Sequence, residues 1–345
     1  MRFVVLGAGA IGGFLGARLA RSGSDVTLVA RGAHLAAMRS RGLRVFGEGE
    51  DVTVPVQCTD DLSVVREADV VFLTMKANAL APVAEQLGAL LRDDTTVVTA
   101  QNGIPWWYFE RHGGPLEGTR LRSVDPDGTI ARSIPIEHVV GCVVYPAAEL
   151  PEPGVVRHVE GIRFPIGELD GSRTPRCEAI SAALVRGGLK CPIRPRIRDD
   201  LWLKLIGNVA FNPVSALGRA TLEEIAADGS ARAAVRILMD EAAAVASALG
   251  VRLEVSVEKR QAGAERIKDH KTSMLQDVEH GRPLELDPLL GAVLEIADLV
   301  DVATPALRAI YGSVRLLDPG SHRDREPVPG AVSSDRWDHP NRAAS

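Results

Sequence analysis

The sequence lacks the features that would indicate a membrane, nucleic-acid or metal-binding protein. No uninterrupted apolar stretch reaches the roughly 18 residues that cross a bilayer, and the formal net charge is only −5 at pH 7. This balance gives no reason to expect nucleic acid or a membrane surface as a partner. The eight histidines form no HxxxH or HExxH pair, so we expect no metal site.

The four cysteines likewise show no CxxC spacing and no small-scaffold pattern, which favours reduced thiols. The N-terminal apolar run contains five glycines, which argues against a secretory signal peptide. We therefore expect a soluble, cytoplasmic protein. The sequence leaves the oligomeric state open, and a homodimer is one option.

Apolar runs at 2–6, 25–29, 70–74 and 97–100 alternate with helical periodicity in the first half of the chain. Strands that alternate with helices predict a parallel sheet covered on both faces. The strand-rich stretch at 139–167, broken by prolines, is interpreted as the antiparallel end of the same domain.

The residue pattern changes after a proline cluster near 192–195, and it has helical periodicity from there to about 317. At 345 residues, the chain is too long for one ordinary core. We predict a Rossmann-type domain at 1–195 and a helical domain at 196–320. A polar tail rich in Pro, Gly and Ser, at 321–345, is predicted to be disordered.

A GxGxxG motif follows the first predicted strand. It consists of Gly7, Ala8, Gly9, Ala10, Ile11 and Gly12. The motif alone is weak among 33 glycines, but here it follows a strand and opens a helix. The first glycine permits a tight turn, the second admits a pyrophosphate, and the third lets helix and strand pack closely. A glycine-rich turn without a ligand is the alternative.

The second predicted strand lacks the acidic residue with which NAD-binding domains hold the ribose hydroxyls. It ends instead at Leu28-Val29-Ala30-Arg31. The Arg31 guanidinium suits a 2′-phosphate, which favours NADP(H) over NAD(H). A merely solvated Arg31 is the alternative, although it would not explain the missing acid.

A polar stripe interrupts an otherwise apolar helical segment of the second domain. Lys204, Asn208 and Asn212 recur every four residues and so share a helix face about 80° wide. Burying one ammonium and two amides without partners is costly. We expect these side chains to line a cleft that holds a ligand with oxygens.

Together these motifs resemble the ketopantoate reductase family, and the resemblance covers nearly everything except the tail. The matching segments are GAGAIGG at 7–13, VAR at 29–31, TMKA at 74–77, QNG at 101–103, LWLKLIGNVAFNPVSA at 201–216, TSMLQDVEHGRP at 272–283 and LELD at 284–287. The resemblance implies NADPH-dependent reduction of a small 2-oxo acid, with 2-dehydropantoate as the preferred substrate and pantothenate biosynthesis as the context.

The resemblance also implies a role for individual positions. It makes Lys204 the proton donor and places Glu285 at the closing side of the cleft, against the cofactor ribose and the lysines. The implied substrate-binding residues are Asn102, Lys204, Asn208, Asn212 and Ser273. It places Lys76 and Asn102 beside the nicotinamide half of the cofactor. Ala147 and Glu285 are further implied cofactor-binding residues, in addition to the glycine loop and Arg31. Taken alone, Lys76 also fits a surface lysine, Asn102 a turn residue and Glu285 a salt-bridge partner.

The residue types suit this chemistry, because an ammonium stabilises the charge that develops on a ketone oxygen and then supplies the proton. Partial burial lowers the pKa of such a lysine toward the working pH. The aromatic segment 106–108 adjoins the implied nicotinamide site and either caps a sheet edge or reshapes the pocket. A reductase of a bulkier 2-oxo acid and a non-catalytic NADP(H) sensor are the alternatives. The charged segment 258–260 is interpreted as a solvated helix face.

Overall fold

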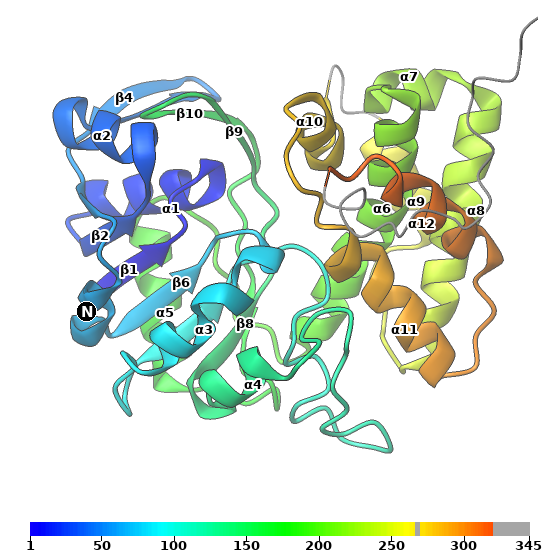
Figure 1. The fold of residues 1–345 in the computed structure, drawn as a ribbon, viewed down its shortest axis with the longest axis horizontal. Helices are drawn as coiled ribbons and strands as arrows, with labels where there is room; N and C mark the ends of the chain where they lie inside the picture. The colour runs from blue at the N-terminus through cyan, green and yellow to red at the C-terminus, as the bar shows by residue number, and fades with distance from the viewer. Residues whose placement is uncertain (266–269, 320–345) are drawn as a thin grey trace, which may run out of the picture.

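The described residues, 1–265 and 270–319, form an N-terminal α/β domain and a C-terminal helical domain in a computed structural model (Figure 1). The predicted fold class, a Rossmann-type parallel sheet followed by helices, is confirmed. Helix α6 (Ile197–Gly218) opens the second domain just after the predicted boundary at 195. The predicted tail at 321–345 lies outside the described residues.

Within the described residues, a seven-stranded sheet forms the centre of the first domain. Its strands are β1 (Arg2–Leu6), β2 (Asp25–Val29), β5 (Gln57–Thr59), β6 (Val70–Leu73), β7 (Thr96–Thr99), β8 (Val139–Cys142) and β11 (Ile166–Gly167). The order is β11-β8-β7-β6-β1-β2-β5, and only the β11–β8 pair is antiparallel. The chain builds outward from β1 on one side and from β6 on the other. A doubly wound sheet binds its ligand where the strand order reverses, here between β1 and β6.

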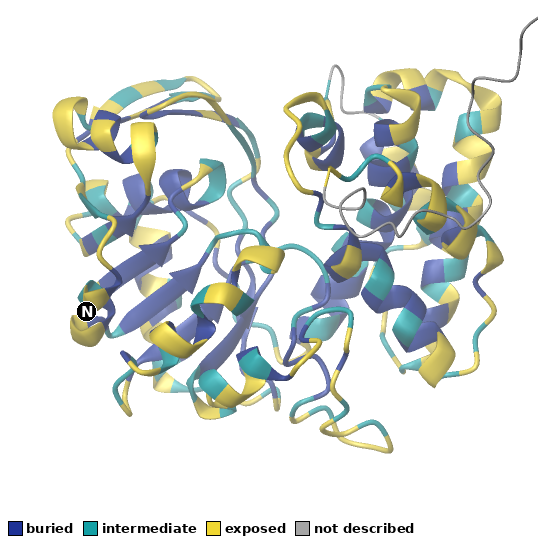
Figure 2. Cartoon of the chain, in the orientation of Figure 1, coloured by how far each residue is buried: buried dark blue, intermediate teal, exposed yellow. Residues whose placement is uncertain are grey.

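The two faces of this sheet carry separate hydrophobic cores. The helices and 3-10 turns of this domain are α1 (Ala10–Arg21), α2 (Gly32–Arg41), η1 (Leu62–Glu67), η2 (Ala77–Ala79), α3 (Ala81–Gly88), α4 (Thr129–Ser133), η3 (Ile136–His138) and α5 (Pro175–Arg186). In β1, Phe3 and Val5 pack with α1, α2 and α5, whereas Val4 and Leu6 pack with α3 and α4. Side chains alternate between the faces of a strand, so both faces of the sheet are buried (Figure 2).

The segment 139–167 is arranged differently from the prediction. β8 continues the parallel sheet, whereas β9 (Ala147–Glu152) and β10 (Val155–Glu160) join β3 (Leu43–Gly47) and β4 (Glu50–Val54) in a second sheet, ordered β4-β3-β10-β9. β10 is parallel to β3, which lies far away in the sequence. The predicted antiparallel pairing is present between β9 and β10 and between β8 and β11. The segment is nevertheless divided between two sheets, because local periodicity does not carry the long-range pairing of β10 with β3.

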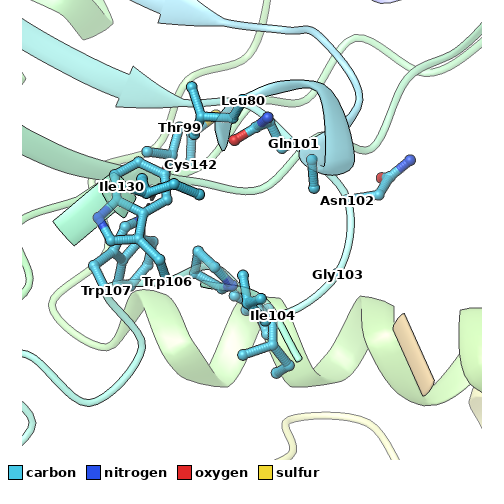
Figure 3. Close-up of a pocket in the computed structure, with 14 residues that line it drawn as sticks. Leu80, Thr99, Gln101, Asn102, Gly103, Ile104, Trp106, Trp107, Ile130 and Cys142 are labelled. Carbon is cyan, nitrogen blue, oxygen red and sulfur yellow. Dashed lines mark hydrogen bonds between the residues drawn. The ribbon is translucent and has the colours of Figure 1, made fainter. Parts of the chain in front are cut away.

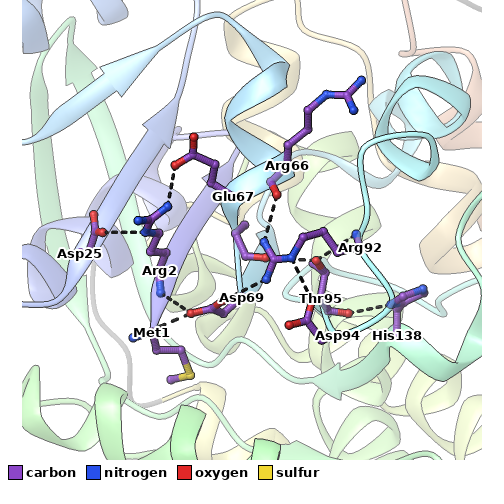
Figure 4. A network of polar contacts seen from close by, with 11 residues as sticks. Met1, Arg2, Asp25, Arg66, Glu67, Asp69, Arg92, Asp94, Thr95 and His138 are labelled. Atoms are coloured by element: carbon purple, nitrogen blue, oxygen red, sulfur yellow. Dashed lines mark hydrogen bonds and ion pairs between the residues drawn. The ribbon is translucent and has the colours of Figure 1, made fainter.

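A polar network ties together the amino ends of the central strands β1, β6 and β7 (Figure 4). The glycine loop follows the opposite, carboxyl end of β1. Asp69 accepts hydrogen bonds from the backbone N–H of Arg2 at 2.8 Å and from Arg92 at 3.1 Å. A ring nitrogen of His138 lies 2.7 Å from the backbone oxygen of Thr95. These contacts fix the sheet at the end remote from the predicted site.

The second domain is built around α6, which packs against α7, α8, α9, α10 and α12. The remaining elements are α7 (Leu222–Ala227), α8 (Gly229–Ala248), α9 (Val257–Ala264), α10 (Ser273–Glu279), a π-helical turn η4 (Asp287–Gly291), α11 (Ala292–Leu299) and α12 (Pro305–Arg315). No helix in the described part of the chain is long and apolar enough to cross a membrane.

The aromatic segment after the Gln-Asn-Gly turn joins the two domains. Trp107 and Tyr108 are buried, and the Trp107 indole N–H donates to Thr99 Oγ1 at 2.9 Å, at the end of β7. Trp202 on α6 donates to the Tyr108 hydroxyl at 2.6 Å, and the Arg198 guanidinium lies over both rings of the segment. Because α6 is anchored here, the segment sets the position of the helix that carries the polar stripe.

Candidate active site

The glycine loop lies at the carboxyl end of β1, and its backbone explains why glycine is needed. Gly7 has φ +99°, a conformation that side chains disfavour. A Cβ at Gly12 would lie 2.4 Å from both the Gly7 oxygen and Thr74 Oγ1, so any side chain would push α1 off β6. At Gly9, no described atom lies within 4 Å of a Cβ position, which leaves that backbone open to a ligand.

The N-terminus of α1 suits an anion. Among the described residues, no side chain caps this helix, and its first turn contains no acidic residue. Free N–H groups and the positive end of the helix dipole therefore face outward. Arg31 is exposed just after β2, whose Val29 oxygen accepts from the Ala8 N–H at 2.9 Å. The uncapped start of α1 thus offers N–H groups to an anion, and the exposed Arg31 guanidinium lies at the end of the neighbouring strand.

A cleft of about 440 Å³ lies between the two domains. Of the residues predicted for the site, the described lining contains Ile11, Asn102, Ala147, Lys204, Asn208, Asn212 and Ser273. The first three come from the α/β domain and the others from the helical domain. The structure thus brings together in one cleft residues that are up to a few hundred positions apart along the chain.

Lys204 is held at the inner wall of this cleft. Its Nζ donates to Asn102 Oδ1 at 2.6 Å and to the backbone oxygen of Val144. Burial lowers the pKa of Lys204 to about 8, an effect that the Arg260 charge reinforces and that Glu285 and Cys142 oppose. The ammonium is therefore oriented and poised to release its proton slightly above neutral pH.

Asn212 is buried in the same wall, one helical turn beyond Asn208. Its amide nitrogen has no hydrogen-bond partner among the described residues. An unmade hydrogen bond on a buried donor costs about 1–3 kcal/mol, so such a group in a cleft calls for a ligand acceptor. Ser273, exposed at the start of α10, adds a hydroxyl on the facing side.

Lys76 and Glu285 lie at contacts between the domains and do not appear among the described residues that line the cleft. Lys76 Nζ donates to Asp277 Oδ2 at 2.7 Å and to the Pro283 oxygen at 2.8 Å. Glu285 accepts from the Ala77 N–H at 2.9 Å, and burial raises the pKa of its carboxyl group. These bonds tie the two domains together, and the roles that the resemblance implies for both residues stay predictions.

Arg260 on α9 was missed, because its charged neighbours suggested a solvated helix face. Its side chain instead lines the cleft and is mostly buried. The signal in the sequence was Gly207, a glycine inside an apolar helix, where it costs about 1 kcal/mol relative to alanine. A Cβ at Gly207 would lie 2.8 Å from Arg260 Nη2, so the glycine makes room for the guanidinium.

A second, much smaller pocket of about 20 Å³ lies on the other side of Asn102 (Figure 3). Trp106, Trp107 and Ile130 form much of its apolar wall. The volume is about that of one water. The aromatic segment therefore packs in the core between the domains and does not widen the main cleft.

No group of three or more His, Cys, Asp or Glu side chains in the described ranges is arranged to hold a metal ion. The described lining of the cleft carries the Lys204 ammonium, two guanidinium groups, two carboxylates, several amides and hydroxyls, and the ring of His270.

Comparison with known proteins covers the same two regions. Residues 3–171 match the family model described as ketopantoate reductase PanE/ApbA, and residues 196–318 match its C-terminal counterpart. A 2-dehydropantoate 2-reductase of Mesorhizobium japonicum is 48% identical over 318 residues, which cover 92% of this chain and 98% of the relative.

Two solved structures are also similar. A ketopantoate reductase described as putative, from Ralstonia solanacearum MolK2, superposes with a TM-score of 0.85 at 43% identity, over 92% of this chain and 97% of that one. A D-mandelate dehydrogenase solved with NADH and anilino(oxo)acetate has a TM-score of 0.79 at 23% identity, over 93% and 100% of the two chains. The similarity spans both domains and the cleft between them.

Proposed function

This chain belongs to the ketopantoate reductase family, and we propose that it reduces 2-dehydropantoate to pantoate with NADPH, a step of pantothenate and coenzyme A biosynthesis. The observation that carries the proposal is the Lys204 ammonium, oriented by Asn102 and Val144 in a cleft that the glycine loop also lines. The 48% identity to a 2-dehydropantoate 2-reductase along almost its whole length supports the choice of substrate.

In this mechanism Lys204 donates a hydrogen bond to the substrate's ketone oxygen and then transfers a proton to it. NADPH, when bound, would supply a hydride to the carbonyl carbon. The hydride on carbon and the Lys204 proton on oxygen together convert the ketone to a secondary alcohol. A pKa of about 8 keeps most Lys204 protonated at neutral pH while making proton release easy. Asn102, which bonds the ammonium at 2.6 Å, orients the donor.

The cofactor proposal rests on the glycine loop and Arg31. The open backbone at Gly9 and the uncapped start of α1 suit a pyrophosphate, and Arg31 suits the 2′-phosphate that distinguishes NADPH from NADH. Within the described residues, Arg31 forms no ion pair that would occupy its guanidinium. Asn102 and Ala147 lie in the cleft where the nicotinamide half would extend.

Asn208, Asn212 and Ser273 are proposed to bind the polar groups of the substrate. The sequence allowed a bulkier 2-oxo acid because of the aromatic segment, but that segment is buried in the interdomain core. A substrate of the size of 2-dehydropantoate is therefore favoured. A cytoplasmic location and a homodimer stay predictions, and analytical ultracentrifugation would test the second.

Steady-state NADPH oxidation with 2-dehydropantoate and a panel of other 2-oxo acids tests the function. The highest kcat/KM is expected for 2-dehydropantoate. Turnover of the other acids alone would refute the substrate. NADPH binding without turnover of any of them would instead favour the non-catalytic sensor.

A further inference from the structure

Arg260 is one of two arginines that line the cleft together with Lys204. Its Nε donates to the backbone oxygen of Leu203 at 3.2 Å, and the described hydrogen bonds and ion pairs leave its two terminal nitrogens without a partner. Glu160 and Tyr145 are the acidic groups that act on its charge, but in the described ranges neither forms an ion pair with it. These terminal nitrogens are not among the buried atoms that lack a partner, so they are open to the cleft, where a ligand can supply an anion.

Arg163, the other arginine that lines the cleft, differs from Arg260 because its charge is paired within the protein. The Arg163 guanidinium donates to the buried carboxylate of Asp200 at 3.1 Å and lies over the Tyr145 ring at 5.1 Å. Its charge is compensated within the protein and serves to fix the start of α6. Arg260 has no such compensation, so the two arginines differ in what they can offer to a ligand.

Gly207 sets where the Arg260 charge lies. The guanidinium rests directly on the bare helix surface at this glycine, with three of its atoms between 2.8 and 3.4 Å from a Cβ position. Gly207 follows Lys204 by three residues, and such residues are neighbours on a helix, about 5–6 Å apart at Cβ. The Arg260 guanidinium therefore lies on α6 about one turn from the Lys204 backbone, and its charge acts on the Lys204 ammonium in the same cleft.

Two cations that line one cleft suit a 2-oxo acid, whose ketone and carboxylate are joined by a single bond. We propose that Arg260 binds the substrate's carboxylate through its terminal nitrogens while Lys204 binds the adjacent ketone oxygen. The inference rests on the proposed function as a 2-oxo acid reductase. It assigns the carboxylate to Arg260 and leaves Asn208, Asn212 and Ser273 for the hydroxyl end of the substrate.

A fork of N–H groups binds a planar carboxylate at two points and fixes its orientation, which a single ammonium does not do. The site therefore selects acids over neutral ketones. It also holds the ketone carbon in one orientation, so that hydride reaches one face only.

Arg260→Gln tests the inference, with Lys259→Gln as the matched control, because Lys259 is the exposed neighbour on the same helix. A hydrogen-bonded charge contributes enough that its loss should raise KM for 2-dehydropantoate about 10- to 100-fold. The neutral lactone of the same 2-oxo acid has no free carboxylate, so its kcat/KM should stay within about twofold. Arg260→Lys should recover only part of the loss, because it keeps the charge but not the fork.

Gly207→Ala tests the same point without removing the arginine. Alanine favours a helix over glycine, so the variant should be at least as stable in thermal unfolding. Its methyl group displaces the guanidinium, and KM for the acid should rise as it does in Arg260→Gln. A loss of stability together with unchanged KM would contradict the placement of Arg260.

A further readout separates binding from a structural role. The Arg260 charge lowers the pKa of Lys204, whereas Glu285 and Cys142 raise it. Arg260→Gln should therefore move the basic limb of the kcat/KM profile to higher pH, while the dissociation constant for NADPH stays unchanged.

Two outcomes would overturn the inference: an unchanged KM for the acid, or equal losses for acid and lactone. If the wild type reduces a different 2-oxo acid, the proposed substrate fails, and the same variants test Arg260 with that acid. If no acid is reduced, calorimetric titration with 2-dehydropantoate decides, since Arg260→Gln should weaken its binding at least tenfold.

Discussion

Replacing Lys204 with methionine should abolish most activity while leaving the fold nearly as stable. Methionine keeps the apolar length of the side chain but removes the proton and the charge. General acids typically contribute a factor of about 10² to 10⁴, so kcat with 2-dehydropantoate should fall by at least about 100-fold, or roughly 2.7 kcal/mol in the barrier.

Two opposing effects set the stability of this variant. Burial displaces the pKa of Lys204 from 10.5 to about 8, which means that holding the ammonium in the cleft costs on the order of 3 kcal/mol near neutral pH. The substitution relieves this cost but leaves the Asn102 and Val144 oxygens without their donor, at about 1–3 kcal/mol. The free energy of unfolding should therefore change by less than about 2 kcal/mol.

The sign of the pH dependence follows from the same displacement. Between about pH 8 and pH 10.5 the unfolded chain holds the Lys204 proton and the folded chain does not, so stability from this group rises with pH across that window. Activity changes in the opposite direction, because the reduction needs the ammonium. kcat/KM for reduction should be level below about pH 8 and fall above it.

Stopped-flow and steady-state NADPH oxidation measure the rate, and urea unfolding measures the stability. Lys204→Arg is the informative contrast, since arginine keeps the charge but does not release its proton at these pH values. A fall in kcat of less than tenfold in Lys204→Met, with normal NADPH binding, would refute the assignment of Lys204 as proton donor.

Three further predictions follow from other parts of the site. Arg31→Ala should raise KM for NADPH at least tenfold while changing KM for NADH little, and equal effects on both cofactors would contradict a 2′-phosphate contact. Glu285→Gln removes a charge that raises the pKa of Lys204, so the basic limb of the pH–rate profile should move to lower pH; an upward displacement would be inconsistent with their coupling. Tyr108→Phe leaves the buried Trp202 N–H without its acceptor and should cost about 1–3 kcal/mol in urea unfolding with kcat nearly unchanged, whereas a large loss of kcat alone would show that the aromatic segment acts on the chemistry.

Local patterns predicted the parts of this protein that depend on neighbouring residues. The strand at 2–6, the glycine turn and the next strand at 25–29 agree with β1 and β2. Periodicity also placed Lys204 and Asn212 on one helix face, because a helix repeats every 3.6 residues wherever it packs. The resemblance, which rests on separated motifs, supplied the family.

Contacts between distant segments were harder to predict. The pairing of β10 with β3 depends on two strands whose own sequences do not specify a partner. Arg260 looked like a solvated residue because its own helix is charged, and only the packing of α9 on Gly207 turns its side chain into the cleft. The sequence allowed the aromatic segment either a structural role or a role in shaping the pocket. Its burial against α6 supports the structural role.

The sequence by itself determined the fold class, the nucleotide loop and the polar stripe, because each is encoded in residues that are neighbours along the chain. The tertiary structure decided how these parts meet. It placed Asn102 Oδ1 2.6 Å from Lys204 Nζ across the domain boundary, bonded Lys76 to Asp277 and put Arg260 in the same cleft as Lys204. The burial of each side chain at such a site, its charged neighbours and its hydrogen-bond partners depend on how distant segments pack. No local pattern in the sequence carries that information.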